Sequence, residues 1–571
     1  MTCRERILSN EYADLVVNFV LPDEYEYERP VDYCNHIINE DLQLFYIKRS
    51  DLPDLRFSKA SYSFIPKCYG LVQVDQQERG VDLNTLSLAD VGILSVQRPP
   101  LNLTGKNVTI GFIDTGIRYQ DEVFRDMAGN SRILAIWDQT IQTGKLPDGF
   151  EYGSEYTQED INAALQSDDP FSIVPSTDAN GHGSELAAVA AGSPIANGNF
   201  IGAAPDARIV MVKLKEIKPY LREYYKIPEG VPCYSETDIL QALQYLQKFS
   251  QVLYTPLVIC FGLGTSLGDH AGSGTLATYL NTLSYKKSQV IVTPAGNEGN
   301  TSHHFHAEMS MREAYKDVQL RVGEDERGFV MDLWGEAPYY YNVTVRTPGG
   351  EGIRWSNPRS PQPQEFTFVF EKTRIIIEYF WVEHTSGAEL IRFRFIEPTA
   401  GVWNIRVNSA GNVAGGCFDI WLPISQFLSS DTYFLEASPQ TTITEPAYAE
   451  GTITVSNYQS SNVSIAPSSG RGFGKNGMIV PDIAAPGVNV STPFGPGNGT
   501  SISAAITAGG CAQLLEWAVV NQNDLFVNST AIKNYLIRGA DREDYLEYPN
   551  REWGYGSLNI AGVFEFLAEL G

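Results

Sequence analysis

The stretch NVTIGFID, residues 107–114, is an apolar run without strict alternation that ends in a carboxylate. Such a run is typical of a strand buried on both faces of a parallel sheet. Three more runs of this kind follow, at 207–214, 256–264 and 288–297. Amphipathic patterns at 235–250, with Ser235 as its cap, and at 274–288 predict helices between them. The alternation predicts a doubly wound α/β sheet whose functional site lies at the carboxyl ends of the strands.

Two other regions flank or interrupt this pattern. Residues 1–97 contain strand-like runs at 12–20, 42–47 and 61–72, and they predict a small α+β unit. Eight short strand-like runs without helices follow one another in a later region, which predicts an inserted, jelly-roll-like β-sandwich. A chain of 571 residues is expected to divide, because single cores stop growing at about 250–300 residues. The predicted parts are an N-terminal region (1–97), an α/β domain in two segments (98–301 and 441–571) and an insert (302–440).

Charge and composition exclude several kinds of partner. The net charge is −26, which argues against nucleic acid and anionic membranes, since both attract basic surfaces. No stretch approaches the roughly 18–20 consecutive apolar residues of a membrane span, and the first residues lack the apolar segment of a secretory signal. Seven scattered cysteines without CxxC spacing predict reduced, mostly buried thiols in a cytoplasmic protein.

Three polar residues stand where such a fold would place chemistry. Asp114 ends the first apolar run, His182 lies between two glycines before a helical run of small residues, and Ser501 lies in the first turn of another. Alone, each has an ordinary structural explanation, as a loop cap or a helix cap. A helix start also favours developing negative charge through its dipole and free N–H groups.

The order of the three residues along the chain, and the residues beside them, indicate that they act together. They follow the chain order of subtilisin rather than that of chymotrypsin. The chain also resembles the subtilisin-like serine proteases (subtilases, the S8 family) in five strings, which are DTG (114–116), GHG (181–183), TPAGNEGN (293–300), PDIAAPG (481–487) and GTSISA (499–504). The resemblance implies a subtilisin-like fold and a catalytic triad of Asp114, His182 and Ser501.

The same resemblance assigns roles around this triad. Asn297 would donate its side-chain amide to the oxyanion hole, together with the backbone N–H of Ser501. The 262–264 strand would pair with an extended peptide, and the 295–296 segment would form part of the pocket for the residue before the cut. The substrate-binding residues would therefore be Gly262, Leu263, Gly264, Ala295 and Gly296.

The implied chemistry is hydrolysis of peptide bonds in a protein or peptide substrate. A serine hydroxyl is a poor nucleophile at neutral pH, so His182 would take its proton and later donate it to the leaving amine. Asp114 would orient the imidazole and stabilise its cationic form. Two alternatives are a catalytically weak subtilase-fold protein that regulates a partner, and a protein whose insert is the principal binding module.

The sequence departs from common subtilase patterns in two places. Ser184 and Glu185 stand where the family commonly has Thr and a second His, for which we expect altered local packing rather than loss of activity. Between Asn297 and Ser501 lie the insert and far more residues than in simple subtilases.

This architecture resembles that of the clostridial spore-germination proteases of the Csp type. The resemblance implies that residues 1–97 are a prodomain that assists folding, inhibits the enzyme and can stay bound after self-cleavage, somewhere between about 72 and 98. It also implies a peptidoglycan hydrolase precursor as the target and a cytoplasmic or spore-associated location.

Metal ligands are the remaining question. His303, His304 and His306 lie close together in TSHHFHAE (301–308), but no separated carboxylate or cysteine ligand is evident, so we predict surface loop histidines. Subtilases often bind calcium, yet the acidic loops here show no diagnostic pattern. We therefore predict no required cofactor and no metal ligands, and leave a structural calcium ion open.

Overall fold

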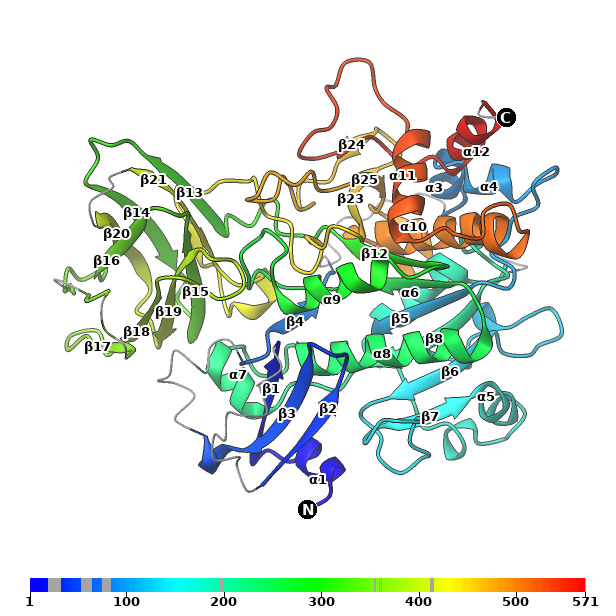
Figure 1. The fold of residues 1–571 in the computed structure, drawn as a ribbon, viewed down its shortest axis with the longest axis horizontal. Coiled ribbons are helices and arrows are strands. Elements are labelled where there is room, and N and C mark those ends of the chain that lie inside the picture. The colour runs from blue at the N-terminus through cyan, green and yellow to red at the C-terminus, as the bar shows by residue number, and fades with distance from the viewer. Residues whose placement is uncertain are drawn as a thin grey trace.

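The α/β part and the all-strand insert lie side by side in the computed structural model, with the N-terminal strands beneath the α/β part (Figure 1). The structure describes residues 1–18, 32–52, 64–73, 84–195, 200–353, 356–358, 360, 362–410 and 415–569. Parts of two predicted strands, 19–20 and 61–63, lie outside these residues.

The central sheet has the predicted alternation, with a parallel middle and antiparallel edges. In sheet order its strands are β24 (Ser464–Ile465), β23 (Ile453–Gln459), β12 (Gln289–Pro294), β10 (Leu257–Phe261), β5 (Thr109–Asp114), β8 (Arg208–Lys213), β6 (Ile133–Asp138) and β7 (Ser154–Thr157), and β25 (Ile483–Pro486) also pairs with β23. Neighbours from β23 to β6 are parallel, whereas β6–β7 and β23–β24 are antiparallel. The four runs predicted to be buried strands are β5, β8, β10 and β12.

Helices cover both faces of this sheet. They are α5 (Gln158–Leu165), α6 (His182–Ala191), α8 (Glu236–Leu253), α9 (Thr275–Ser284), α10 (Thr500–Leu515) and α11 (Ser529–Gly539). In addition, α12 (Ile560–Glu569) packs on α11, and α7 (Pro219–Tyr225) packs between the N-terminal sheet and the insert. As predicted, Ser235 caps α8, since its hydroxyl accepts from the Thr237 N–H. One core joins α8 and α9 to one face, and another joins α6 and α10 to the other. The subtilisin-like layered fold is thus confirmed.

The N-terminal region forms an antiparallel sheet that packs on α8. After α1 (Cys3–Leu8), its order is β1 (Tyr12–Val17), β3 (Gln43–Lys48) and β2 (Tyr33–Ile37). A further strand, β4 (Cys68–Leu71), pairs instead with β11 (Leu263–Gly264) and β9 (Tyr234–Ser235) of the α/β domain. The helices α3 (Asn84–Asp90) and α4 (Ile93–Val96) also leave this sheet, and Leu88 and Ile93 lie in the core shared by α10 and α12.

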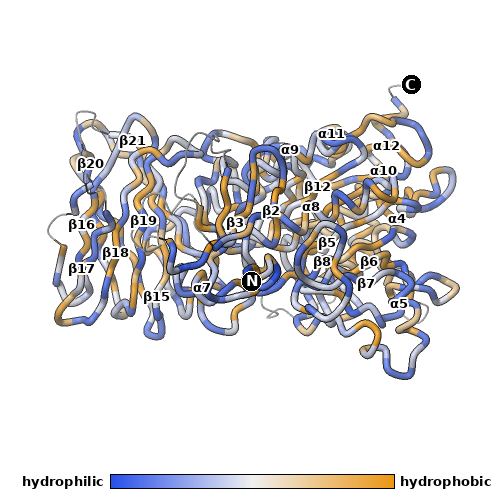
Figure 2. The backbone as a smooth tube through the Cα atoms, turned by 60° about the horizontal axis from the view of Figure 1, so that its bottom comes forward, coloured by the Kyte–Doolittle hydropathy of each residue, from blue (hydrophilic) through white to orange (hydrophobic). Residues whose placement is uncertain are grey.

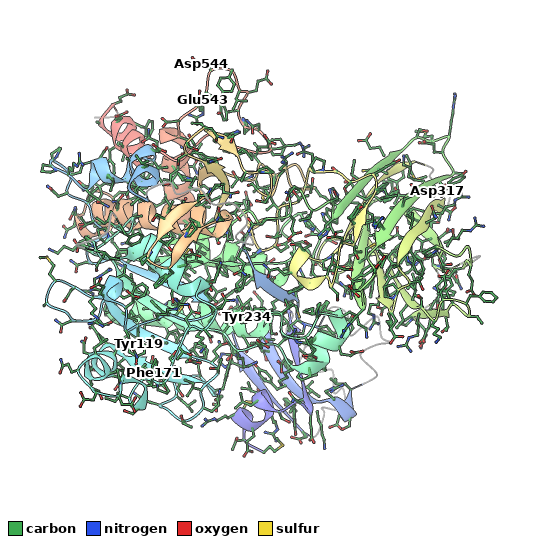
Figure 3. All side chains as sticks on the ribbon, turned by 180° about the vertical axis from the view of Figure 1, so that it is seen from behind. Tyr119, Phe171, Tyr234, Asp317, Glu543 and Asp544 are labelled. Carbon is green, nitrogen blue, oxygen red and sulfur yellow. A yellow bond between two sulfur atoms is a disulfide. The ribbon has the colours of Figure 1, made fainter. Side chains whose placement is uncertain are left out.

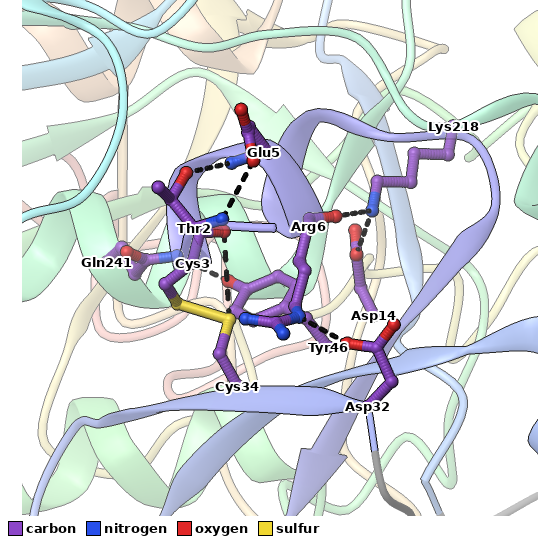
Figure 4. Close-up of a disulfide and its surroundings, with 10 residues drawn as sticks. All are labelled: Thr2, Cys3, Glu5, Arg6, Asp14, Asp32, Cys34, Tyr46, Lys218 and Gln241. Atoms are coloured by element: carbon purple, nitrogen blue, oxygen red, sulfur yellow. Dashed lines mark hydrogen bonds and ion pairs between the residues drawn. A yellow bond between two sulfur atoms is a disulfide. The ribbon is translucent and has the colours of Figure 1, made fainter.

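The cysteine prediction is wrong for two of the seven residues. Cys3 of α1 and Cys34 of β2 form a disulfide (Figure 4). Their Cα atoms lie 5.5 Å apart because the helix packs against the strand, a proximity that spacing along the chain does not reveal. The other five are free, as predicted; Cys417 is partly exposed and the rest are buried.

The insert is a sandwich of two antiparallel sheets, as predicted. One has the order β13 (His304–Met309), β21 (Gly416–Trp421), β15 (Gly328–Gly335), β19 (Glu389–Ile396), β18 (Arg374–Phe380) and β17 (Gln364–Thr367), and the other β16 (Tyr340–Arg346), β20 (Gly401–Ala410), β14 (Tyr315–Val322) and β22 (Tyr433–Phe434). Their inner faces share one apolar core. The eight predicted runs all overlap strands, and β13 and β22 were not predicted.

Apolar residues follow the central strands and those of the insert (Figure 2). Within the described residues, one helical stretch, Thr500–Val520, is apolar and long enough to cross a membrane by length and composition. However, 89% of its most apolar window is buried in the protein, where α10 packs against the sheet. This stretch is the core helix that carries Ser501, and beside it β26 (Val490–Thr492) and β27 (Gly495–Gly497) form a small hairpin.

Candidate active site

The structure brings Asp114, His182 and Ser501 together at the carboxyl edge of the central sheet. Asp114 ends β5, His182 begins α6 and Ser501 is the second residue of α10. His182 Nδ1 lies 2.9 and 3.0 Å from the Asp114 carboxylate oxygens, and its Nε2 lies 3.3 Å from Ser501 Oγ. All three residues are buried. They form the hydrogen-bonded chain that a serine nucleophile, its base and the partner of that base require.

Charge around the imidazole favours its protonated form. Burial lowers the pKa of His182, but the Asp114 carboxylate and its hydrogen bond outweigh burial, and with Glu185 and Asp178 they raise this pKa to about 9. Glu185, where many subtilases have a second histidine, is itself half-buried, and burial raises the pKa of its carboxyl. The ring must therefore lose a proton before it can act as a base.

Asp178 organises the loops that carry the triad, a role that the sequence analysis missed. Its Oδ1 accepts hydrogen bonds from the Thr115 hydroxyl and the Gly181 N–H, each 2.9 Å long. Its Oδ2 accepts from the Ser184 N–H and hydroxyl at 2.9 and 2.6 Å. Asp178 thus joins the loop after Asp114 to the first turn of α6. The signal in the sequence was a carboxylate just before the Gly-His-Gly string.

Asn297 lies where its amide can donate to a developing oxyanion. Its Oδ1 accepts from the backbone N–H and hydroxyl of Thr500, at 3.1 and 3.2 Å, which fixes the side chain beside Ser501. Its Nδ2 is buried and has no hydrogen-bond partner among the described residues. A buried amide without a partner is costly unless something binds there. This geometry suits the stabilisation of an oxyanion, with the N–H of Ser501 as the second donor.

The predicted cleft strand is occupied by the chain's own β4. Leu263 pairs with Leu71 and Gly264 with Gly70 in antiparallel register, and the Val72 N–H donates to the Gly262 carbonyl at 2.8 Å. On its other side β4 pairs with β9, whose Tyr234 lies near the centre of the molecule in Figure 3. The 262–264 strand therefore holds an extended peptide, as expected of added β-strand recognition.

Gly264 and Gly296 form a wall beside Val72. Both face the side chain of Thr444, because a Cβ added at either glycine would clash with the Thr444 hydroxyl. Val72 Cγ2 would lie 3.0 Å from the Cβ at Gly264. Ala295 is buried behind this wall, and its carbonyl accepts from the Thr444 N–H at 3.0 Å. Thr444, which the sequence analysis did not identify, therefore fills the space between the two glycines next to Val72.

Of the three predicted surface loop histidines, His303 and His304 are buried, because the segment continues into β13 of the insert's sheet. His306 is exposed, but it lies on β13 and not in a loop. His304 Nε2 and His306 Nδ1 lie 3.0 and 2.7 Å from the same Asp419 oxygen. Burial raises the pKa of Asp419, but the hydrogen bonds with His304 and His306 outweigh burial and hold this pKa well below its usual range. Among the described residues, no group of three His, Cys, Asp or Glu side chains is arranged to hold a metal.

The layered α/β sheet carries a Ser–His–Asp chain at its carboxyl edge, beside a cleft that binds an extended strand. This combination defines a subtilisin-like serine endopeptidase. The model of the subtilase family (Peptidase_S8) matches residues 105–318 and 388–556. The chain therefore belongs to the subtilase family.

Individual relatives agree with this assignment. The solved structure of the CspB protease of Clostridium perfringens is similar over 85% of this chain and 98% of its own, at 32% identity and a TM-score of 0.75. The subtilisin-like proteases SBT3.3 and SBT3.6 of Arabidopsis thaliana are 29% and 25% identical over 34% and 28% of this chain. The chain matches about a quarter of the length of each plant relative. The resemblance to Csp-type proteases is confirmed.

Proposed function

We propose that this chain is a self-processing serine endopeptidase that cuts its own polypeptide between Val72 and Gln73. The observation that carries the proposal is the position of β4, which lies in the substrate cleft as an extended strand in antiparallel register. A prodomain held this way presents its last residues to the triad as a substrate would.

The register of the strand selects the bond. Val72 lies opposite Gly262, and a Cβ added at Gly262 would contact Asp114 Oδ2 and lie 2.8 Å from His182 Cε1. The strand therefore meets the triad at Val72. The Val72 side chain is buried beside Gly264 and Thr444, whereas Gln73 is exposed. This supports Val72 as the residue before the cut and shortens the proposed prodomain to residues 1–72.

The triad residues would act in sequence. His182, once deprotonated, takes the proton of Ser501 as the hydroxyl oxygen attacks the Val72 carbonyl carbon. Asp114 holds the ring in place and stabilises its cation. The Asn297 amide and the Ser501 N–H donate hydrogen bonds to the oxyanion that forms. His182 then gives the proton to the leaving amine of Gln73, and water releases residues 1–72 from the acyl-enzyme.

Contacts across the N-terminal sheet support a prodomain that stays bound. Lys218 Nζ lies 2.6 Å from Asp14 Oδ1, with both side chains buried (Figure 4). The Gln241 amide on α8 donates to the Tyr46 hydroxyl at 2.8 Å. These contacts do not involve the bond to be cut, so they remain after cleavage. Bound residues 1–72 would then keep the cleft filled until a trigger removes them.

The test compares the wild-type chain with Ser501→Ala by intact mass after native purification. We expect a fragment ending at Val72, of about 8 kDa given 63.2 kDa for 571 residues, from the wild type alone. Two uncut chains would refute self-processing, and a fragment of another length would move the bond. Labelling of Ser501 by a fluorophosphonate probe, after the fragment is removed, separates a protease from a catalytically weak regulator.

The natural substrate belongs to the same proposal. The Csp-type resemblance of the sequence implies the precursor of a peptidoglycan hydrolase as the protein cut in trans. Incubating such a precursor with the processed wild-type chain and with Ser501→Ala tests this step. A precursor left intact by a wild-type chain that labels with the probe would refute this target while leaving the protease proposal standing.

A further inference from the structure

A short turn of the insert lies directly on the cleft strand. The 3₁₀ turn Ser425–Phe427, preceded by Ile424, comes from the segment that leads out of β21. The Gln426 side-chain amide donates to the Leu71 carbonyl at 2.6 Å. Ile424 and Phe427 are buried in one cluster with Cys68 of β4. The insert therefore forms a wall of the cleft, although it lies outside the α/β domain.

This wall packs closely against Gly70. A Cβ added there would lie 2.5 Å from Ile424 Cδ1, and 3.1 and 3.2 Å from two ring carbons of Phe427. Because the optimal separation of carbon atoms is about 3.5–4.0 Å, the Ile424 and Phe427 side chains would both have to shift to admit a side chain at position 70. Successive side chains of a strand point to opposite faces, so position 70 faces the turn while Tyr69 and Leu71 enter the opposite core.

The backbone gives no other reason for glycine at this position. Gly70 is not among the residues with positive φ, and it lies in a regular antiparallel pair with Gly264. Any residue can adopt such an extended conformation. Space beneath the turn is therefore what excludes a larger residue.

The turn is also held in place by Glu298, the residue after Asn297. The Glu298 carboxylate, next to Asn297, accepts from the Ser425 N–H and hydroxyl, each at 3.1 Å. His303 Nδ1 lies 3.1 Å from the other Glu298 oxygen. Although burial opposes ionisation, these hydrogen bonds lower the pKa of Glu298. A turn fixed to an ionised, buried carboxylate cannot move away at small cost to admit a side chain.

We infer that the insert turn 424–427 is a specificity element that selects glycine at the third residue before the cut. The inference depends on the proposed self-cleavage after Val72, which makes Gly70 that residue. Gln426 binds the backbone carbonyl of the second residue and so favours any extended peptide, whereas Ile424 and Phe427 reject side chains at the third. Substrates cut in trans should carry the same glycine three residues before the bond.

The experiment measures the rate of self-cleavage in full-length chains refolded from denaturant, with the folded fraction followed by near-ultraviolet circular dichroism. The test variant is Gly70→Ala. Ile424→Val removes only the Cδ1 carbon that would clash, and it is made alone and together with Gly70→Ala. Gly352→Ala is the matched control, because the nearest atom to its added Cβ is 3.4 Å away and its φ is not positive.

We expect Gly70→Ala to slow cleavage of the folded chain at least tenfold, and the double variant to regain most of that loss, while Gly352→Ala cuts at the wild-type rate. Cleavage of Gly70→Ala at the wild-type rate would overturn the inference. So would a double variant that remains as slow, or as poorly folded, as Gly70→Ala. A wild-type chain that stays uncut, like Ser501→Ala, would instead refute the proposed function on which this inference depends.

Discussion

Thr444 packs beside Val72, so under the proposed cut after Val72 its replacement should change which residue can precede the bond. Its hydroxyl would lie 2.5 Å from a Cβ at Gly264 and closer still to one at Gly296, so the side chain fills the gap between the two walls. Val72 Cγ2 already approaches the Gly264 wall. A phenylalanine at position 72 needs the space that Thr444 occupies, and Thr444→Ala frees that space.

The expected magnitude follows from packing. Forcing a larger side chain into a filled site costs about 1–3 kcal/mol. If this cost appears in the transition state, Val72→Phe should cut itself roughly 5- to 150-fold more slowly than the wild type, at about 1.36 kcal/mol per tenfold. Adding Thr444→Ala should bring the rate back to within a few-fold of the wild type. The assay is the loss of full-length chain with time after refolding, quantified by intact mass.

A shape-preserving control separates space from hydrogen bonding. Thr444→Val keeps the branched shape and replaces the hydroxyl, which has no hydrogen-bond partner among the described residues, by a methyl group. Val72→Phe with Thr444→Val should therefore stay slow. The reasoning fails if Val72→Phe alone cuts at the wild-type rate, or if Thr444→Val restores the rate as well as Thr444→Ala does.

The other predictions concern the oxyanion hole, the base and the bound prodomain. Asn297→Ala should lower the rate of self-cleavage by about 10²–10³, a value carried over from subtilisin, with an unchanged circular dichroism spectrum. Because the pKa of His182 is raised to about 9 and the protonated ring cannot accept the Ser501 proton, the rate should rise about tenfold per pH unit below that value and then level off. Glu185→Gln removes one of the carboxylates that raise this pKa, so the midpoint of the rate profile should move to lower pH; an unmoved midpoint would contradict the assignment. Lys218→Met leaves Asp14 buried without its cation, which should weaken retention of the cut fragment by about 3–5 kcal/mol, measured by co-elution on gel filtration, whereas Lys226→Met at an exposed ion pair should not.

The parts of the fold that were predictable are those encoded in local pattern. Strands β5, β8, β10 and β12 lie between helices on both faces of a sheet, so they are apolar on both sides and stand out as continuous runs. Asp114, His182 and Ser501 follow short glycine-containing strings at strand ends and helix starts. The topology of the fold then brings these three residues to one edge of the sheet, so the candidate site could be predicted from local sequence.

The parts that were missed depend on contacts between distant segments. Cys3 and Cys34 meet because α1 packs against β2, and His304 is buried because β13 joins a sheet whose next strand is more than a hundred residues away. Thr444 follows the insert in the chain and carries no motif of its own. Its role appears only when the returning chain places it between Gly264 and Gly296. The hydrophobic pattern of a segment indicates which of its residues are buried, but it does not indicate which other segment packs against it.

The position of the insert in the chain explains how a β-sandwich comes to shape a protease cleft. The chain leaves the α/β domain just after Asn297 and returns just before Thr444, so both junctions are walls of the substrate site. The Trp421 ring stacks on His270, from the loop after β11, and on His304, with ring centroids 3.9 and 4.6 Å apart. A sandwich fixed at two cleft walls and at the loop beyond the cleft strand cannot shift without altering the pocket. Under the proposed self-cleavage, its contacts with β4 would belong to substrate recognition, and the insert would be part of the site as well as a brace.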